Sequence, residues 1–161
     1  LANIADSSAI SNTTTETNFS INRTISITMF QPGRIIRLKV GGVYSTTSTP
    51  TLTFRVRFGT TNLVVFGAKT GINNASNQSW AAIAEIICRT TGSSGTVMAQ
   101  GTLFCNTASA VDTVETVVNN AATTVDTTVN QTLQVSLVWS AASTSNTATM
   151  KNLIAEISDY P

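Results

Sequence analysis

The sequence contains no histidine. Histidine is the commonest general base, the usual partner of a nucleophilic serine and the commonest protein ligand for metal ions. The chain also lacks a phosphate-binding loop, a dinucleotide-binding glycine fingerprint and the Gly-x-Ser-x-Gly motif of a nucleophile elbow. We therefore expect no catalytic residues, no cofactor and no bound metal ion.

Charge is scarce as well. Only 11% of the residues are charged, against about 25% in an average soluble domain, and the formal net charge is +1. Binding to a phosphate backbone needs clustered basic residues, and here they are scattered apart from Arg34, Arg37 and Lys39 and the pair Arg55 and Arg57. No apolar run approaches the roughly 20 residues that span a bilayer. These features indicate a protein that binds neither nucleic acid nor membrane.

Two cysteines, Cys88 and Cys105, are too few for a disulfide framework. If Gly92–Gly95 forms a hairpin turn, Cys88 lies opposite about Ala99, and Cys105 lies six residues further along the partner strand. At about 3.3 Å per residue, that separation is roughly 20 Å, whereas a disulfide requires Cα atoms less than about 7 Å apart. The sequence predicts two free thiols, which favours assembly in a reducing cytoplasm.

What the sequence does have is alternation of apolar and polar residues with a period of two, the pattern of half-buried strands. The pattern is clearest over 51–58, where Leu52, Phe54 and Val56 share one face. Gly41 and Gly42 predict a bulge or a close backbone approach inside a strand. The pattern predicts strands over 24–29, 34–44, 51–58, 63–66, 96–104, 131–140 and 148–157, with a short additional strand over 114–118.

Residues 80–91 are ambiguous, because the segment AAIAEII (81–87) also suits a helix by propensity. We interpret the segment as a strand, because it runs through a Gly-rich turn at 92–95 into another strand and a hairpin explains both halves.

About eight evenly spaced strands, with no convincing helix and no internal repeat, imply an all-β sandwich or barrel. An antiparallel jelly-roll sandwich fits the strand count best. An immunoglobulin-like sandwich is the alternative, although its Cys-Trp-Cys pattern is missing. We expect a single jelly-roll domain over residues 13–161, preceded by an N-terminal arm over residues 1–12 that becomes ordered only on a partner surface.

Carboxylates are the remaining candidates for chemistry. Glu85 and Glu156 lie in predicted strands and could be neighbours, as in a glycosidase pair, but pairing with arginines on adjacent strands or exposure to water is the favoured interpretation. Asp112, Glu115 and Asp126 could offer oxygen ligands to calcium. Because they lack EF-hand spacing, we interpret them as solvated loop acids.

Trp80, Trp139, Arg55 and Arg57 are candidate interface residues. Exposed tryptophans could stack on sugar rings, yet Trp139 shares the parity of the apolar residues over 131–138, which favours the core or an interface. We expect Arg55 and Arg57 to lie on the solvated face of a strand. The alternative is that they contact a carboxylate of another subunit.

Several turn and strand segments carry a resemblance that spans most of the chain. In order they are SNTTTET (11–17), GVYSTT (42–47), PTLTFRV (50–56), RTTGSSGTV (89–97), QG (100–101), DTTVNQTL (126–133) and WSAASTSNT (139–147). This set resembles β-rich structural proteins of tailed bacteriophages, which include head decoration (cement) proteins, head fibres and domains of tail appendages. The resemblance implies a jelly roll, usually trimeric, with no catalytic residues. Residues 106–125 have no counterpart in it.

We therefore expect a non-enzymatic virion protein that is assembled in the host cytoplasm. The first hypothesis is a capsid decoration or head-fibre protein, a homotrimer that binds the major capsid protein or another virion protein on the outside of the head. Three-fold packing would cover apolar surface through a closed heterologous interface. The alternative is a tail-fibre domain that binds a cell-surface glycan through exposed aromatics. A secreted carbohydrate-binding module is a third hypothesis, against which the unpaired cysteines argue.

Overall fold

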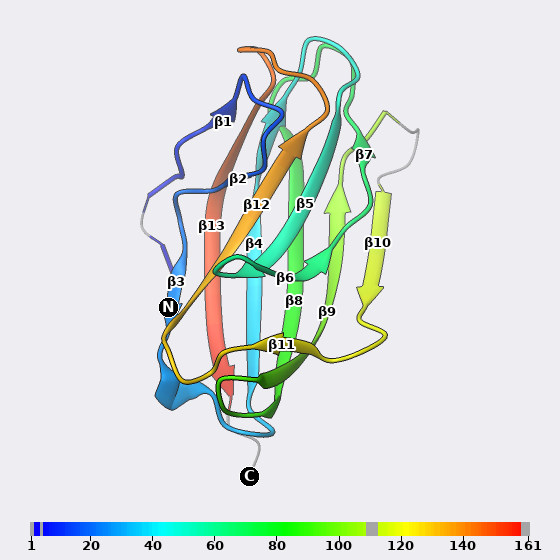
Figure 1. The fold of residues 1–161 in the computed structure, drawn as a ribbon. Coiled ribbons are helices and arrows are strands. Elements are labelled where there is room, and N and C mark those ends of the chain that lie inside the picture. The colour runs from blue at the N-terminus through cyan, green and yellow to red at the C-terminus, as the bar shows by residue number, and fades with distance from the viewer. Residues whose placement is uncertain (1, 4, 109–112, 159–161) are drawn as a thin grey trace.

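The computed structural model describes residues 2–3, 5–108 and 113–158, which form two antiparallel sheets packed face to face (Figure 1). Sheet A contains, in spatial order, β1 (Ile10–Ser11), β13 (Thr147–Ser158), β4 (Ile35–Ser45), β8 (Gln78–Thr90), β9 (Gly95–Cys105) and β10 (Thr113–Val118), and β11 (Thr123–Val125) also pairs with β9. Sheet B contains β2 (Thr17–Asn18), β12 (Gln131–Trp139), β5 (Thr51–Phe58) and β6 (Thr61–Val65), with β3 (Arg23–Ile25) on β12 and β7 (Lys69–Thr70) on β5.

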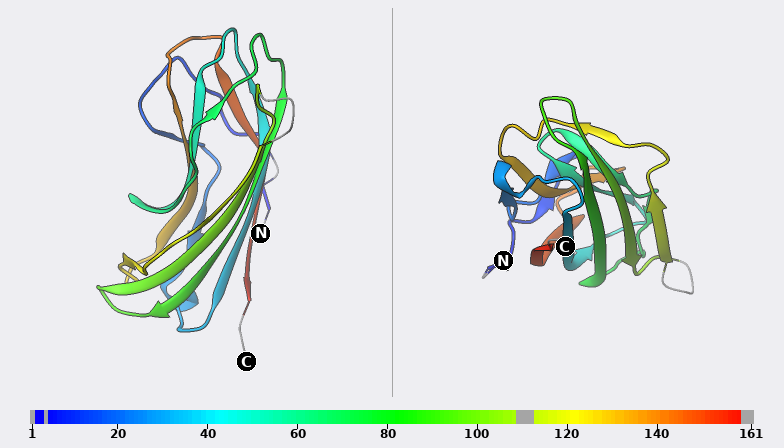
Figure 2. Two further views of the ribbon diagram at one scale, coloured as in Figure 1. Left: turned by 90° about the vertical axis from the view of Figure 1, so that its right-hand side faces the viewer. Right: turned by 90° about the horizontal axis from the view of Figure 1, so that it is seen from below.

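The predicted all-β antiparallel sandwich is confirmed. The eight strands with five or more residues are β4, β5, β6, β8, β9, β10, β12 and β13. The chain crosses from sheet A to sheet B after β4, returns after β7, and crosses twice more around β12, so the connections are jelly-roll-like. Figure 2 shows sheet B lying over one face of sheet A and the strands of sheet A curving along their length. Among the described residues, no second layer covers the other face of sheet A.

The ambiguous segment is a strand. Residues of β8 alternate between buried and more exposed positions along its whole length, and β8 pairs with β9 from Trp80↔Cys105 to Thr90↔Thr96. Tertiary pairing therefore overrides the helix propensity of the alanines. The same register places Cys88 opposite Val97, at the far end of the hairpin from Cys105. As predicted, neither cysteine is in a disulfide, and both are buried.

The predicted strand over 24–29 is wrong in its second half. β3 ends at Ile25, and residues Ile27–Met29 form a single turn of 3-10 helix, η1. The Ser26 hydroxyl accepts the Thr28 N–H at 3.4 Å, and the Asn130 side chain accepts the Ile27 N–H at 3.1 Å. Such side-chain acceptors compete with the strand ladder for backbone donors. Ile27 and Met29 therefore project into solvent instead of alternating into the core.

The glycine pair lies on β4, where its pairing with β13 is irregular. The register between β4 and β13 shifts between Met150 and Asn152, so the bulge occurs on β13, opposite Gly41 and Gly42. A Cβ atom on Gly42 would lie only 2.1 Å from the Thr149 carbonyl oxygen. The close approach predicted from the glycines is thus present, and the extra residue belongs to the partner strand.

The N-terminal segment, expected to be an arm, runs along the outer edge of β13. Ile10 pairs with Ala148 and is buried, and the Ser7 N–H donates to the Met150 carbonyl at 2.9 Å. Asn3 donates its N–H to the Leu153 carbonyl. In this structure the segment covers the edge of sheet A within its own molecule, and it needs no partner surface to be placed there.

Candidate functional site

Both tryptophans lie in the core. Trp80 is 2% exposed and Trp139 is 1% exposed. The Trp80 ring packs between Phe54, at a centroid distance of 4.6 Å, and Phe19, at 5.4 Å, while the Trp139 indole N–H donates to the Ile10 carbonyl. Burial to this degree removes both side chains from any interface between folded subunits. It also removes the stacking surface that a glycan-binding role would take from them.

Arg55 and Arg57 project from β5 onto the outer face of sheet B, where Glu16 contacts both. The Arg57 guanidinium lies 3.0 Å from the Glu16 carboxylate, Arg55 forms a second ion pair with it, and the Ser136 hydroxyl donates to it as well. All three charged side chains are at most 25% exposed. The carboxylate partner that a subunit contact would supply is therefore found in the same chain, and the group fastens the segment before β2 onto sheet B.

Glu85 and Glu156 are not direct cross-strand neighbours. Arg37 lies between Glu85 and Glu156 in the cross-strand register, and its Nε donates to Glu85 at 2.9 Å. Hydrogen bonds from Arg37 and Gln100 lower the pKa of Glu85 below its usual value. Glu85 therefore pairs with an arginine on the adjacent strand, as the sequence analysis predicts.

Glu115 and Asp126, two of the three acids considered for calcium, interact with different partners. Glu115 forms an ion pair with Lys69 at 2.7 Å, and Asp126 accepts hydrogen bonds from the N–H and hydroxyl of Thr128. Asp112 lies outside the described residues. Within the residues that the structure describes, no group of three or more Cys, Asp or Glu side chains could hold a metal ion.

The Glu115 ion pair joins the two sheets at one edge of the sandwich, since Glu115 lies on β10 and Lys69 on β7. Burial alone would raise the pKa of Glu115, but hydrogen bonds from Lys69 and the Gly67 N–H, together with the charge of Lys69, lower it below the usual value. A carboxylate whose folded-state pKa is lowered contributes stability above its unfolded-state pKa, and this contribution is lost as the pH falls through the folded-state pKa.

We therefore expect the stability difference between the wild type and Glu115→Gln to be largest near neutral pH. The difference should shrink as the pH falls below the unfolded-state pKa of about 4.3 and be lost below the lower folded-state pKa. Denaturant unfolding of both proteins at a series of pH values measures this difference. Asp6→Asn is the control, because the Asp6–Lys151 pair is about half exposed and contributes little at any pH. A difference that stays constant down to pH 3 would show that the charge of Glu115 is not what stabilises the edge.

The outer face of sheet A carries five of the nine exposed large hydrophobic side chains among the described residues. Residues directly opposite one another share a face of the sheet, and the rows that face outward contain large hydrophobic side chains between 37% and 58% exposed. We call these residues the sheet A patch; they are Ile83 on β8, Phe104 on β9, Val114 and Val118 on β10 and Ile154 on β13.

The dimensions of this face suit a protein contact. Five strands about 4.8 Å apart and four cross-strand rows about 6.6 Å apart give the whole face an area of roughly 600 Å², of which the apolar side chains occupy a part. Two shallow hollows of about 240 and 160 Å³ lie between its outward side chains. Charged residues are confined to its β13–β4–β8 side, where Lys39, Arg37 and Glu85 lie. The β9–β10 side is uncharged.

Sheet B presents a different outer face. Its outward residues on β5 are threonines and the paired Arg55 and Arg57. In the described part of sheet B, Val65 on β6 is the one large hydrophobic side chain with comparable exposure, at 44%. The two faces of the sandwich therefore differ in polarity, and the apolar one is that of sheet A.

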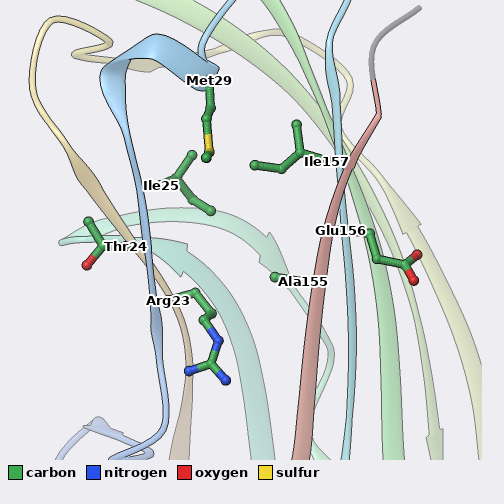
Figure 3. Close-up of a pocket in the computed structure, with 7 residues that line it drawn as sticks. All are labelled: Arg23, Thr24, Ile25, Met29, Ala155, Glu156 and Ile157. Carbon is green, nitrogen blue, oxygen red and sulfur yellow. The ribbon is translucent and has the colours of Figure 1, made fainter. Parts of the chain in front are cut away.

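A second apolar feature is a cleft at the open edge of the sandwich, between β3 and η1 on one side and β13 on the other (Figure 3). Its volume is about 350 Å³. Ile25 and Ile157 point toward each other across it, and Met29 hangs over it from η1. Arg23 lies at its lower end, with a buried Nε that has no hydrogen-bond partner. Ile25 is only 2% exposed, so the cleft presents little of that side chain at the surface.

No model of a known protein family matches the chain, and a search of curated proteins finds no match either. No helix among the described residues is long and apolar enough to cross a membrane.

The sequence analysis missed both the sheet A patch and the cleft. A signal for the patch was present in β8 and β9, where apolar residues occupy both parities, since Ile83 and Phe104 lie out of phase with the core. A strand that is apolar on both faces is typically covered on both. The cleft could not have been found in this way, because it depends on the turn at η1.

Proposed function

We propose that this chain is a non-enzymatic virion structural protein, a capsid decoration or head-fibre protein that acts as a homotrimer on the outer surface of a phage head. The observation that carries the proposal is the polarity difference between the two sheets. The outer face of sheet A is uncovered and carries exposed apolar side chains, so another protein surface is needed to cover it.

Binding through the outer face of sheet A also suits a structural role. Apolar side chains on a rigid sheet bind by buried area and shape, and no group has to move or react. On a capsid the same contact repeats many times over the shell, so each one can be of modest affinity. The major capsid protein or another virion protein is the partner in this proposal. The resemblance of the turn and strand segments to tailed-phage structural proteins supports the same assignment.

Co-sedimentation tests this function. Purified protein is mixed with expanded, undecorated phage heads and with unexpanded heads, and both are pelleted through a sucrose cushion. We expect saturable pelleting with the expanded heads, at a stoichiometry that is a multiple of three per binding position. Recovery of all the protein in the supernatant with expanded heads from the phage that encodes it would contradict the proposal.

A further inference from the structure

Strand β10 forms one edge of sheet A, at the end of the sheet opposite β1 (Figure 1). Among the described residues β10 pairs with β9, and no strand lies along its other side. The unpaired backbone N–H and C=O groups of an edge strand are a template on which a further strand can pair. The outer side of β10 is therefore a candidate site for strand addition.

The other edges of the two sheets are covered or short. The N-terminal segment covers the outer side of β13, and the edge strands of sheet B, β2, β3, β6 and β7, have two to five residues each. β10 has six residues, none of them lysine, arginine or proline. Its one charged residue, Glu115, forms an ion pair with Lys69 on β7 at 2.7 Å. Short strands, added charges and prolines usually prevent pairing at an edge, and β10 has none of these except that paired carboxylate.

The backbone groups on the open side of β10 belong to Val114, Thr116 and Val118. Just past the strand, the Asn119 N–H donates to the Ala99 carbonyl at 3.1 Å, which continues the β9–β10 register by one pair. In an antiparallel ladder, residues that exchange hydrogen bonds with the neighbouring strand alternate with residues that do not. Counting back from this pair, the three named residues point their N–H and C=O groups away from β9.

The sequence of β10 is complementary to a second copy of itself that runs in the opposite direction. Residues whose backbone groups point outward can exchange hydrogen bonds across the contact. Thr116 then pairs with Thr116 of the second copy, and Val114 pairs with Val118 of the second copy. Glu115 lies opposite Val117 of the second copy, so the two carboxylates do not face each other.

Other registers are less favourable. A shift of two residues in one direction places Glu115 opposite Glu115 of the second copy, and like charges directly opposite one another destabilise a sheet. A shift of two residues in the other direction places Val114 opposite Asn120, which lies beyond the end of β10. A shift of one residue sets outward-pointing backbone groups against groups that are bonded to β9. One register is therefore preferred.

The side chains on the outer face match in this register. Val114 and Val118 are 58% and 57% exposed in the single chain, and each lies beside the other valine of the second copy. Thr116, also exposed, lies beside its own counterpart. Pairs of β-branched residues and of threonines at opposite positions stabilise antiparallel sheets. Because paired residues point to the same face, the outer faces of sheet A in the two copies become one continuous surface.

We infer that two copies of this chain pair antiparallel through β10, about a two-fold axis at Thr116. The inference goes beyond the proposed function, because the contact needs no phage head. A two-fold contact uses one patch of each copy, so it is compatible with a three-fold contact made elsewhere. A single strand edge buries less surface than a standard stable interface, so the contact is weak in solution and is best detected by trapping it with a disulfide.

Single cysteines on β10 of the full chain test the pairing and its register under mild oxidation. Thr116→Cys is expected to form a covalent dimer, with twice the mass of the chain on a non-reducing denaturing gel, because opposite positions are close enough for a disulfide. Val114→Cys alone and Val118→Cys alone should stay unlinked, because identical positions are then about 13 Å apart along the strands. An equimolar mixture of these two variants should form the covalent dimer.

Three controls accompany this experiment. The wild type, whose two cysteines are buried, should stay unlinked. Val65→Cys, at 44% exposure on sheet B, measures linking through random collision. Adding Thr116→Lys to both members of the Val114→Cys and Val118→Cys mixture should abolish linking, because two lysines would face each other. Circular dichroism checks that each variant is folded.

Three results would overturn the inference. One is a Thr116→Cys protein that links no more than Val65→Cys. Another is a Val114→Cys protein that links by itself as readily as the mixture, which would indicate a different register. The third is a Thr116→Cys protein that links to a capsid protein on phage heads and not to itself, which would assign the edge to another partner. Self-linking is measured without heads, so co-sedimentation still decides the proposed function separately.

Discussion

Gly42→Ala is expected to lower the free energy of unfolding by at least about 3 kcal/mol, at the upper end of the overpacking range. The added Cβ would lie 2.1 Å from the Thr149 carbonyl oxygen and 2.9 Å from two carbons of the Trp80 ring. The oxygen belongs to a paired strand and cannot move without breaking the β4–β13 ladder. Denaturant unfolding followed by tryptophan fluorescence measures the change.

Gly41→Ala is the matched control, one residue away on the same strand. Its Cβ would meet its nearest neighbours at 3.4 Å, which is ordinary contact. We expect the free energy of unfolding to change by less than about 1 kcal/mol, because the alanine also restricts the unfolded chain. Equal effects at the two positions would mean that the close approach at Gly42 does not exist in solution.

Trp80→Ala is the second large effect. The ring fills the space between Phe54 and Phe19, which belong to sheet B and to the segment after β2, so it links the two layers. Truncation of a buried tryptophan to alanine costs about 3–5 kcal/mol through lost contacts and a cavity. Thermal and denaturant unfolding of the variant, followed by far-ultraviolet circular dichroism, measure the loss.

Trp80→Phe separates packing from hydrogen bonding at the same site. The indole Nε1–H of Trp80 is buried without a hydrogen-bond partner, and an unpaired buried donor is unfavourable. Phenylalanine keeps an aromatic ring against Phe54 and removes that donor. We expect a much smaller loss than for alanine. A loss as large as that of Trp80→Ala would show that the indole makes a polar contact that holds it in place.

Much of the fold could be predicted from the sequence, because strand pairing follows directly from side-chain alternation. Residues 51–58 are a strand with the predicted bounds, and residues 78–105 form the predicted hairpin. Leu52, Phe54 and Val56 face the core as their spacing requires. In such segments local pattern and tertiary burial agree, so period-two reasoning suffices.

The sequence misled where local hydrogen bonds compete with the ladder. The apolar residues Ile25, Ile27 and Met29 alternate as in a strand, yet acceptors on Ser26 and Asn130 turn the chain into η1. Asn130 is 103 positions away from Ile27, so no local pattern could reveal that contact. The N-terminal segment is a similar case, because its polar composition does not show that Ser7 and Asn3 pair with β13.

The candidate site was predicted poorly for a physical reason. Trp80 and Trp139 are candidates because aromatic rings can stack on sugars, but both side chains lie in the core. Arg55 and Arg57 were considered because they are charged, and Glu16 of the same chain pairs with both. The residues that define the surface, Val114 and Val118, have no special chemistry. They matter because of where the sheet places them.

The most direct test of the proposed virion role is electron cryomicroscopy of phage particles whose copy of this chain carries a small fused label. The account predicts label density in groups of three on the outer surface of the head, with the outer face of sheet A in each copy covered by another protein. Label on the tail or absent from the particle, or copies whose outer sheet A face is bare of any protein contact, would contradict it.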